Sequence, residues 1–336
     1  MRTQLDSISS MSLGDLQVLE SVGRCLAPKL DGLKGRRLIF NRDDKKLVPY
    51  DGWGLNGNKE TAVVTTVRPA TEKVLVAAVD SSCVKVAETE EGSLLAVKCG
   101  IATSIWGNAL MHFKIGPILF YLTEDSARES DLDVRLSRAV LLDDEMAMRL
   151  VRVRAERAIQ FELASHLAGA IILVDGSLRA SVFEERRRSL TKIAEECVMR
   201  RSTLVGISKG TKFKPLERAA APLSNVPGPA FIEVDDLVKN LVKNSLGSNY
   251  MIRLDATGPV LRADVMGASG AESLGRLIAN DSVSAGYPES LRLAHHISAF
   301  AATELTCLRS HILRNYDVIE LAAQDIRRIV LGSIST

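Results

Sequence analysis

The feature that most constrains the fold is the apolar segment at residues 168–174, which ends abruptly in Asp175. A short and continuous apolar run of this kind is typical of a strand that is buried on both faces of a sheet. Residues 74–79 form a second such run, and it ends in Asp80. Because ligands bind where the strands of an open α/β sheet end, both aspartates are predicted to lie at a binding site.

The composition limits the class of protein. The chain has 336 residues, enough for one large domain or two small ones, and its 46% of hydrophobic residues indicates a sizeable core. A net charge of +2 does not by itself indicate a nucleic acid or membrane partner, and the five cysteines show no CxxC spacing. The longest apolar run is far shorter than the ~20 residues that span a bilayer. We therefore expect a soluble, cytoplasmic protein with free thiols.

The order of the apolar patterns predicts an α/β fold. A strand at 73–82 is followed by strands at 93–106 and 110–122, which form an antiparallel meander. A helix at 143–167, a strand at 170–175, a helix at 181–200 and a strand at 203–207 then alternate, as in an α/β sheet. The other predicted elements are a helix at 13–33, loops at 41–60 and 215–229, a helix at 235–244, a hairpin of strands at 250–255 and 259–265, and helices at 271–280, 289–313 and 318–331.

Three acids are candidates for metal chemistry. Asp80 and Asp175 end buried strands, and Glu156 lies at the edge of the apolar stripe of the helix at 143–167. Acids that converge repel one another unless a cation joins them, and oxygen ligands favour Mg²⁺ or Mn²⁺. Two such ions can promote hydrolysis of a phosphodiester. The alternative is that the aspartates cap turns, since Asp-Ser-Ser and Asp-Gly-Ser are turn sequences, and that Glu156 or its competitor Glu162 is solvated.

Several other residues could act at such a site. His295 or His296 could bind the metal or carry a proton, Lys209 could hold a phosphate, and Tyr287 precedes a proline that starts a helix. Each could instead be an ordinary packed or solvated residue. Arginines on two segments are candidate contacts to the DNA backbone: Arg149, Arg152, Arg154, Arg157 and residues 186–188. Of these, Arg152 is the residue that we assign to DNA binding. The sequence contains no Walker loop, GxGxxG or HExxH, which argues against an ATPase or a Rossmann dehydrogenase.

Taken together, the ordered motifs resemble the NurA nuclease family of archaea and some bacteria. They are VAAVDSS at 76–82, RAERAIQFELA at 154–164, ILVDGSL at 172–178, GISK at 206–209, YMIRLD at 250–255 and GYPESLRLAHHIS at 286–298. The resemblance implies an RNase H-like mixed sheet flanked by helices, with extra N- and C-terminal helices. It divides the chain into a helical and loop region at 1–72, a nuclease domain at 73–314 and a C-terminal helix at 315–336.

The resemblance also implies an active site. It assigns the catalytic and metal-binding acids to Asp80, Glu156 and Asp175, and adds Tyr287 and His295, with His296 as the alternative histidine. His295 would be a further metal ligand, and Lys209 would lie at the same site. The implied cofactor is Mn²⁺, with Mg²⁺ possible. One departure from the family pattern is Ser81, which stands where the family more usually has a glycine.

The implied activity is a DNA nuclease. NurA-like proteins act as single-strand endonucleases and as exonucleases on single- and double-stranded DNA, during end resection for double-strand break repair. They form homodimers and work with HerA, a hexameric DNA-translocating ATPase. Two alternatives stay open from the sequence: a non-catalytic DNA-clamp or docking subunit of the translocase complex, and another metal-dependent phosphoesterase on the same fold.

Overall fold

The computed structural model describes residues 34–35, 37–38, 63–209, 216, 219–242 and 244–321. The helix predicted at 13–33 and the loop predicted at 41–60 lie outside the described residues, as does most of the helix predicted at 318–331. In the part of the chain that is described, no helix is both long enough and apolar enough to cross a bilayer.

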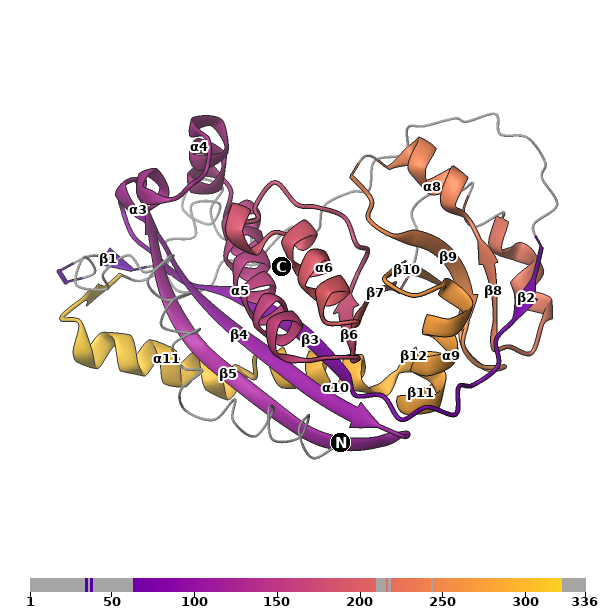
Figure 1. Cartoon of the computed structure of the whole chain (residues 1–336). Coiled ribbons are helices and arrows are strands. Elements are labelled where there is room, and N and C mark those ends of the chain that lie inside the picture. The colour runs from indigo at the N-terminus through magenta and orange to yellow at the C-terminus, as the bar shows by residue number, and fades with distance from the viewer. Residues whose placement is uncertain are drawn as a thin grey trace, which may run out of the picture.

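A mixed sheet forms the centre of the molecule (Figure 1). Among the described residues it has nine strands, in the order β2 (Thr65–Thr66), β8 (Ala230–Glu233), β9 (Ser248–Arg253), β10 (Leu261–Met266), β7 (Thr203–Ser208), β6 (Ile171–Asp175), β3 (Val76–Glu88), β4 (Gly92–Ile105) and β5 (Asn108–Thr123). Two short pairs lie outside it: β1 (Arg37–Leu38) with β13 (Ile319–Glu320), and β11 (Val283–Ser284) with β12 (Tyr287–Pro288).

The strand directions confirm the predicted fold class. Strands β3, β6 and β7 run parallel, and β4 and β5 extend the sheet beyond β3 as the expected antiparallel meander. The predicted hairpin of β9 and β10 continues the sheet beyond β7 with antiparallel pairing. The chain is therefore an RNase H-like α/β protein whose sheet opens with three antiparallel strands.

Helices cover both faces of the sheet (Figure 1). On one face, α5 (Asp144–His166) and α6 (Leu190–Met199) bury alternate residues of β3, among them Ala77 and Val79. On the other face, α9 (Gly270–Asn280) and α10 (Glu289–Ser298) pack against Val76 and Ala78. Side chains alternate along a strand, so Asp80 lies on the α10 face and Ser81 on the α5 face. The other α-helices among the described residues are α3 (Glu124–Glu129), α4 (Val134–Leu142), α8 (Asp235–Leu241) and α11 (Ala302–Asn315).

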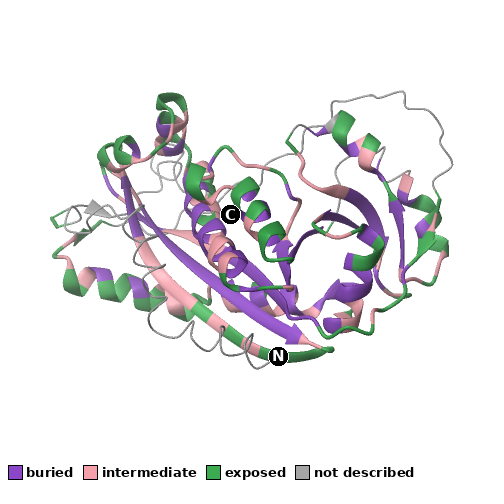
Figure 2. Cartoon of the chain, in the orientation of Figure 1, coloured by how far each residue is buried: buried purple, intermediate pink, exposed green. Residues whose placement is uncertain are grey.

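The burial pattern follows this layering. Figure 2 shows buried residues running along β3 and β4, whereas the start of the edge strand β5 is exposed. The helix α5 begins where predicted, because the Asp143 carboxylate accepts the backbone N–H groups of Glu145 and Met146 at 2.8 and 3.3 Å. A cap of this kind stabilises a helix by about 1 kcal/mol.

The predicted end of the first strand is wrong. The sequence suggested a strand at 73–82 that stops at the Asp-Ser-Ser segment, but β3 continues to Glu88 because β4 pairs with it along its length. Asp80 lies within the strand, directly opposite Gly100 of β4. The alternative that Asp80 caps a turn is therefore excluded.

The helix predicted at 181–200 is shorter than expected. Only a 3-10 turn, η3 (Arg186–Arg188), precedes α6. Glu184 accepts the side-chain Nε–H of Arg157 at 2.9 Å and the backbone N–H of Leu190 at 3.1 Å. These tertiary contacts, together with the buried Phe183, hold the segment in an irregular conformation.

The long helix predicted at 289–313 is interrupted between α10 and α11. Glu304 accepts the backbone N–H of Ala301 at 2.9 Å, and the buried Lys98 donates to the same carboxylate at 2.6 Å. The break is thus stabilised by an ion pair with β4. Beyond α11, Ile319 and Glu320 form the strand β13 where a helix was predicted.

The contact between α10 and β4 depends on Gly100. A Cβ atom on this residue would lie 2.2 Å from the carbonyl oxygen of Ala294 in α10. We expect Gly100→Ala to push α10 away from the sheet and to lower the free energy of unfolding by about 1–3 kcal/mol, the usual cost of overpacking. Urea denaturation measures this change, and Ala109→Val, an exposed change on β5, is the control. An unchanged unfolding midpoint in Gly100→Ala would contradict the close packing.

Candidate metal centre

The parallel pairing of β3 with β6 brings two aspartates together. Val79 is paired with Val174, so the next residues, Asp80 and Asp175, lie side by side on neighbouring strands. Both side chains project from the α10 face of the sheet, because each is two residues beyond a side chain buried there. Asp175 is the last residue of β6 and is less buried than the four residues before it.

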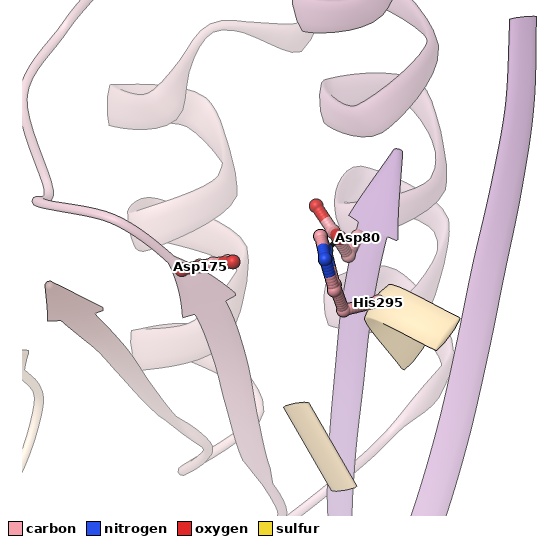
Figure 3. Close-up of side chains that lie close together, drawn as sticks. All are labelled: Asp80, Asp175 and His295. Atoms are coloured by element: carbon pink, nitrogen blue, oxygen red, sulfur yellow. Dashed lines mark hydrogen bonds and ion pairs between the residues drawn. The ribbon is translucent and has the colours of Figure 1, made fainter. Parts of the chain in front are cut away.

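A histidine from α10 completes the cluster (Figure 3). His295 Nδ1 lies 2.7 Å from Asp80 Oδ2, and the Ser298 hydroxyl donates to the same oxygen at 3.2 Å. One ligand atom from each of Asp80, Asp175 and His295 lies within 4.8 Å of the others. Of the two candidate histidines, His295 is therefore the one that the fold brings to the acids.

Asp175 has two further partners. The Tyr287 hydroxyl donates to Asp175 Oδ1 at 3.1 Å, and Lys209 Nζ lies 2.8 Å from Asp175 Oδ2. Burial raises the pKa of Tyr287, and the Asp175 carboxylate raises it further, so the phenol stays protonated and donates. The Lys209 ammonium is also 5.2 Å from the Tyr287 ring centroid. Tyr287 and Lys209 thus both contact the Asp175 carboxylate of the cluster.

The turn that carries Tyr287 is anchored to the β9–β10 hairpin. Asp255 Oδ2 accepts the backbone N–H of Gly286 at 2.7 Å, while Oδ1 accepts the N–H groups of Thr257 and Gly258. At the start of α10, the buried Asp281 accepts from Ser290. These contacts give Tyr287 and His295 fixed positions relative to the sheet.

The residues at the cluster fit a divalent cation. Two carboxylates and an imidazole form a donor set with mostly oxygen ligands, which suits hard or borderline cations. The two acids share one face of the sheet, and like charges at this separation disfavour each other unless a positive charge intervenes. His295 keeps 54% of its side chain exposed, so solvent reaches the cluster. If Nδ1–H donates to Asp80, Nε2 is the nitrogen with a free lone pair.

Glu156 is not a member of this cluster. It extends from α5 on the opposite face of the sheet, where it accepts from the Ser81 hydroxyl at 3.0 Å and from the Gln160 amide at 2.9 Å. Burial raises the pKa of Glu156, and the neighbouring Arg157 opposes that shift. The link from Glu156 to the cluster runs through the strand, since Ser81 follows Asp80. Its role as a metal ligand stays a prediction.

The structure divides the candidate DNA-binding arginines into two groups. Arg154 and Arg157 are buried: Arg154 pairs with Asp131 and donates to the carbonyl of Phe183, while Arg157 pairs with Glu184. The prediction that these two contact DNA is wrong, because their guanidinium groups hold the fold together. The second group consists of the exposed Arg149, Arg152, Arg186 and Arg187 and the half-buried Arg188, and contact of these residues with DNA stays a prediction.

Sequence reasoning missed three contributors to the site. Ser298 bonds Asp80, and its position three residues after His295, almost one helical turn, was the available signal. Ser81 bonds Glu156, although the sequence suggested only a turn residue. Gly100 allows α10 to pack closely against β4, but nothing in the sequence distinguishes it from other glycines.

One family model matches part of the chain. The NurA domain model matches residues 74–223, which include Asp80, Glu156, Asp175 and Lys209 but end before Tyr287 and His295. No curated protein matches the chain.

Solved structures give distant likenesses. The NurA nuclease from Sulfolobus solfataricus shares 14% identity, with 93% of this chain and 97% of that chain covered and a TM-score of 0.43. A second NurA structure shares 12% identity over 75% of this chain and 91% of that chain, with a TM-score of 0.44. Endonuclease V from Ciona intestinalis, in complex with an inosine-containing DNA, shares 13% identity over 71% of this chain and 89% of that chain, with a TM-score of 0.35.

The fold and the cluster define the class: an RNase H-like α/β protein with two aspartates and a histidine that could hold a metal ion. Residues 74–223 match the NurA domain model, and this range contains four of the motifs that resemble the NurA family. A NurA domain supports a nuclease.

The burial of Glu156 has a measurable consequence for the protein without metal. A carboxyl whose pKa is raised by folding keeps its proton longer in the folded state, so stability falls as the pH rises through its ordinary pKa towards the raised one. We expect Glu156→Gln to be more stable than the wild type at neutral pH, with the difference disappearing in acid. Thermal unfolding in EDTA at several pH values measures this, with Glu162→Gln on the same helix as the control. A constant difference across pH would contradict it.

Proposed function

We propose that this chain is a metal-dependent deoxyribonuclease that hydrolyses phosphodiester bonds at the cluster of Asp80, Asp175 and His295. The observation that supports it most is the convergence of these three side chains, with ligand atoms within 4.8 Å, inside and beside a NurA domain. The proposed cofactor is Mn²⁺, with Mg²⁺ as the alternative, because carboxylate oxygens suit both ions and an added imidazole favours the softer one.

In this proposal each residue has a separate task. A bound divalent cation supplies the positive charge that lowers the pKa of water and offsets the charge of the phosphate. Asp80 and Asp175 hold the cation, and Tyr287 fixes the Asp175 carboxylate through its hydroxyl. Asp80 aligns the ring of His295, which acts as a further ligand to the cation or as a proton carrier.

Lys209 and Glu156 complete the proposed set. The Lys209 ammonium pairs with Asp175 in the protein alone, and it turns to the scissile phosphate when DNA enters. The family resemblance assigns Glu156 to the cation as a further ligand, and its observed contact with Ser81 holds β3 in place. Arg152, which is exposed one turn before Glu156 on α5, contacts the DNA backbone.

The family resemblance supports finer proposals. The chain would cut single-stranded DNA internally, degrade single- and double-stranded DNA from the ends, and take part in end resection at double-strand breaks. It would act as a homodimer with a HerA-type hexameric ATPase. A domain of residues 73–314 would carry the nuclease, between the regions at 1–72 and 315–336.

The direct test is cleavage of end-labelled single- and double-stranded DNA with Mn²⁺, Mg²⁺ or EDTA. We expect cleavage with Mn²⁺, none with EDTA, and a loss of more than about 100-fold in Asp80→Ala, since even residues that only support a metal site cost 10–100-fold. Asp133→Ala, which removes an exposed cap of α4, is the control and should cleave normally. Wild-type rates in Asp80→Ala would disprove the site assignment.

Lys209 gives a second test, because it competes with a cation for Asp175. Its side chain is 52% exposed, so the ion pair is worth at most about 1 kcal/mol. We expect Lys209→Ala to bind Mn²⁺ up to about fivefold more tightly in calorimetry, yet to cleave DNA more slowly because a phosphate contact is lost. Lys192→Ala on α6 is the matched control. Weaker Mn²⁺ binding in Lys209→Ala would show that the lysine supports the cation site in another way.

A further inference from the structure

The loop that follows Asp175 lies flat across the neighbouring strand β7. The backbone N–H of Gly176 donates to the carbonyl of Ile207 at 2.8 Å, which continues the pairing of β6 with β7. The loop then passes directly over Gly206, where a Cβ atom would lie 2.6 Å from the carbonyl oxygen of Gly176. The absence of a side chain at Gly206 therefore sets the height of the loop above the sheet.

The far end of this loop is bound to β10. The backbone N–H of Leu178 donates to Asp264 Oδ2 at 2.9 Å, and the carbonyl of Leu178 accepts the N–H of Leu246 at 2.8 Å. Asp264 and Leu178 have no exposed surface. Three residues after Asp175, the chain is thus fixed to a buried carboxylate on a strand that β7 separates from β6.

Asp264 is itself held by a buried arginine. Arg262 donates from Nε to Asp264 Oδ1 at 2.8 Å and from Nη2 to Oδ2 at 3.0 Å, a bidentate pair. The same Nη2 donates to Asn249 Oδ1 at 2.9 Å, and Asn249 donates in turn to Asp235. Each carboxylate oxygen of Asp264 is therefore occupied, and its direction is set by a planar guanidinium group.

Such a pair is a poor source of stability, because the desolvation of two charges offsets most of their attraction. A hydrophobic pair would stabilise the strand as well. The pair does one thing that apolar side chains cannot: it gives the backbone of the loop an acceptor at a fixed point.

We propose that the Arg262–Asp264 pair is a positioning element for Asp175, which holds the DGSL turn so that the Asp175 carboxylate stays beside Asp80. This inference rests on the proposed function in one respect, namely that Asp175 binds the cation. Arg262 and Asp264 lie on the sheet face opposite to the cluster, so they act through the loop and do not touch the cation.

The test compares three variants of the full-length protein: Asp264→Ala, Asp264→Asn and Val265→Ala. Val265 is the matched control, because it is buried on the other face of the same strand and its truncation weakens the core without touching the loop. Two quantities are measured: amide hydrogen exchange at Gly176 and Leu178 without metal, and Mn²⁺ affinity by calorimetry.

We expect Asp264→Ala to speed exchange at both amides about tenfold or more and to weaken Mn²⁺ binding about 10–100-fold. Asp264→Asn keeps an oxygen that accepts from Leu178, so it should restore much of both losses. Val265→Ala should change neither quantity beyond its effect on global stability. If Asp264→Ala does not fold, faster exchange at Leu178 in Asp264→Asn than in Val265→Ala is the expected result.

Wild-type exchange at Gly176 and Leu178 in Asp264→Ala would overturn the positioning role, as would equal losses in Val265→Ala. If the wild-type protein showed no Mn²⁺ binding, or if its Mn²⁺ binding did not depend on Asp175, the proposed function would be overturned instead. In that case the exchange rates alone decide whether the pair holds the loop.

Discussion

The parallel register between β3 and β6 is the constraint on which the site depends. It places two carboxylates side by side on one face of a sheet, where their repulsion works against the fold. The surrounding groups offset that repulsion: His295 and Ser298 bond Asp80, while Lys209 and Tyr287 bond Asp175. The same side chains that offset the repulsion between the two acids are the ones that, in the proposed function, would hold a cation and contact a phosphate.

Much of this site could be predicted from the sequence, because its parts sit at recognisable places. Asp175 ends an apolar strand, Tyr287 precedes a helix, and His295 follows two turns later. The sequence did not predict on which face of the sheet each candidate side chain lies. Glu156 was grouped with the aspartates, but alternation along β3 places its partner Ser81 on the face opposite to Asp80. Two of the four arginines on α5 are buried, and which two also depends on distant residues, here Asp131 and Glu184.

The errors in the predicted elements have one physical origin. Local propensity favoured a helix at 181–200 and a single helix at 289–313, and tertiary ion pairs changed both outcomes. Glu184 forms an ion pair with Arg157, and Glu304 forms one with Lys98. Each segment therefore adopts the conformation that pairs its glutamate with a buried basic side chain on another element. Strand β3 likewise runs on past Asp80 because β4 offers it partners. The strands and helices with strong apolar periodicity, such as α5 and the β9–β10 hairpin, were predicted within a few residues.

The contact between His295 and Asp80 joins residues 215 positions apart. A chain emerges from the ribosome from its N-terminus, and its domains fold in that order. Strands β3, β4 and β5 can pair early, but the face of β3 that carries Asp80 stays uncovered until α10 has been synthesised. The two acids therefore meet their histidine only after α10 has been synthesised, and a shortened chain that stops before α10 carries the aspartates without the histidine of the cluster.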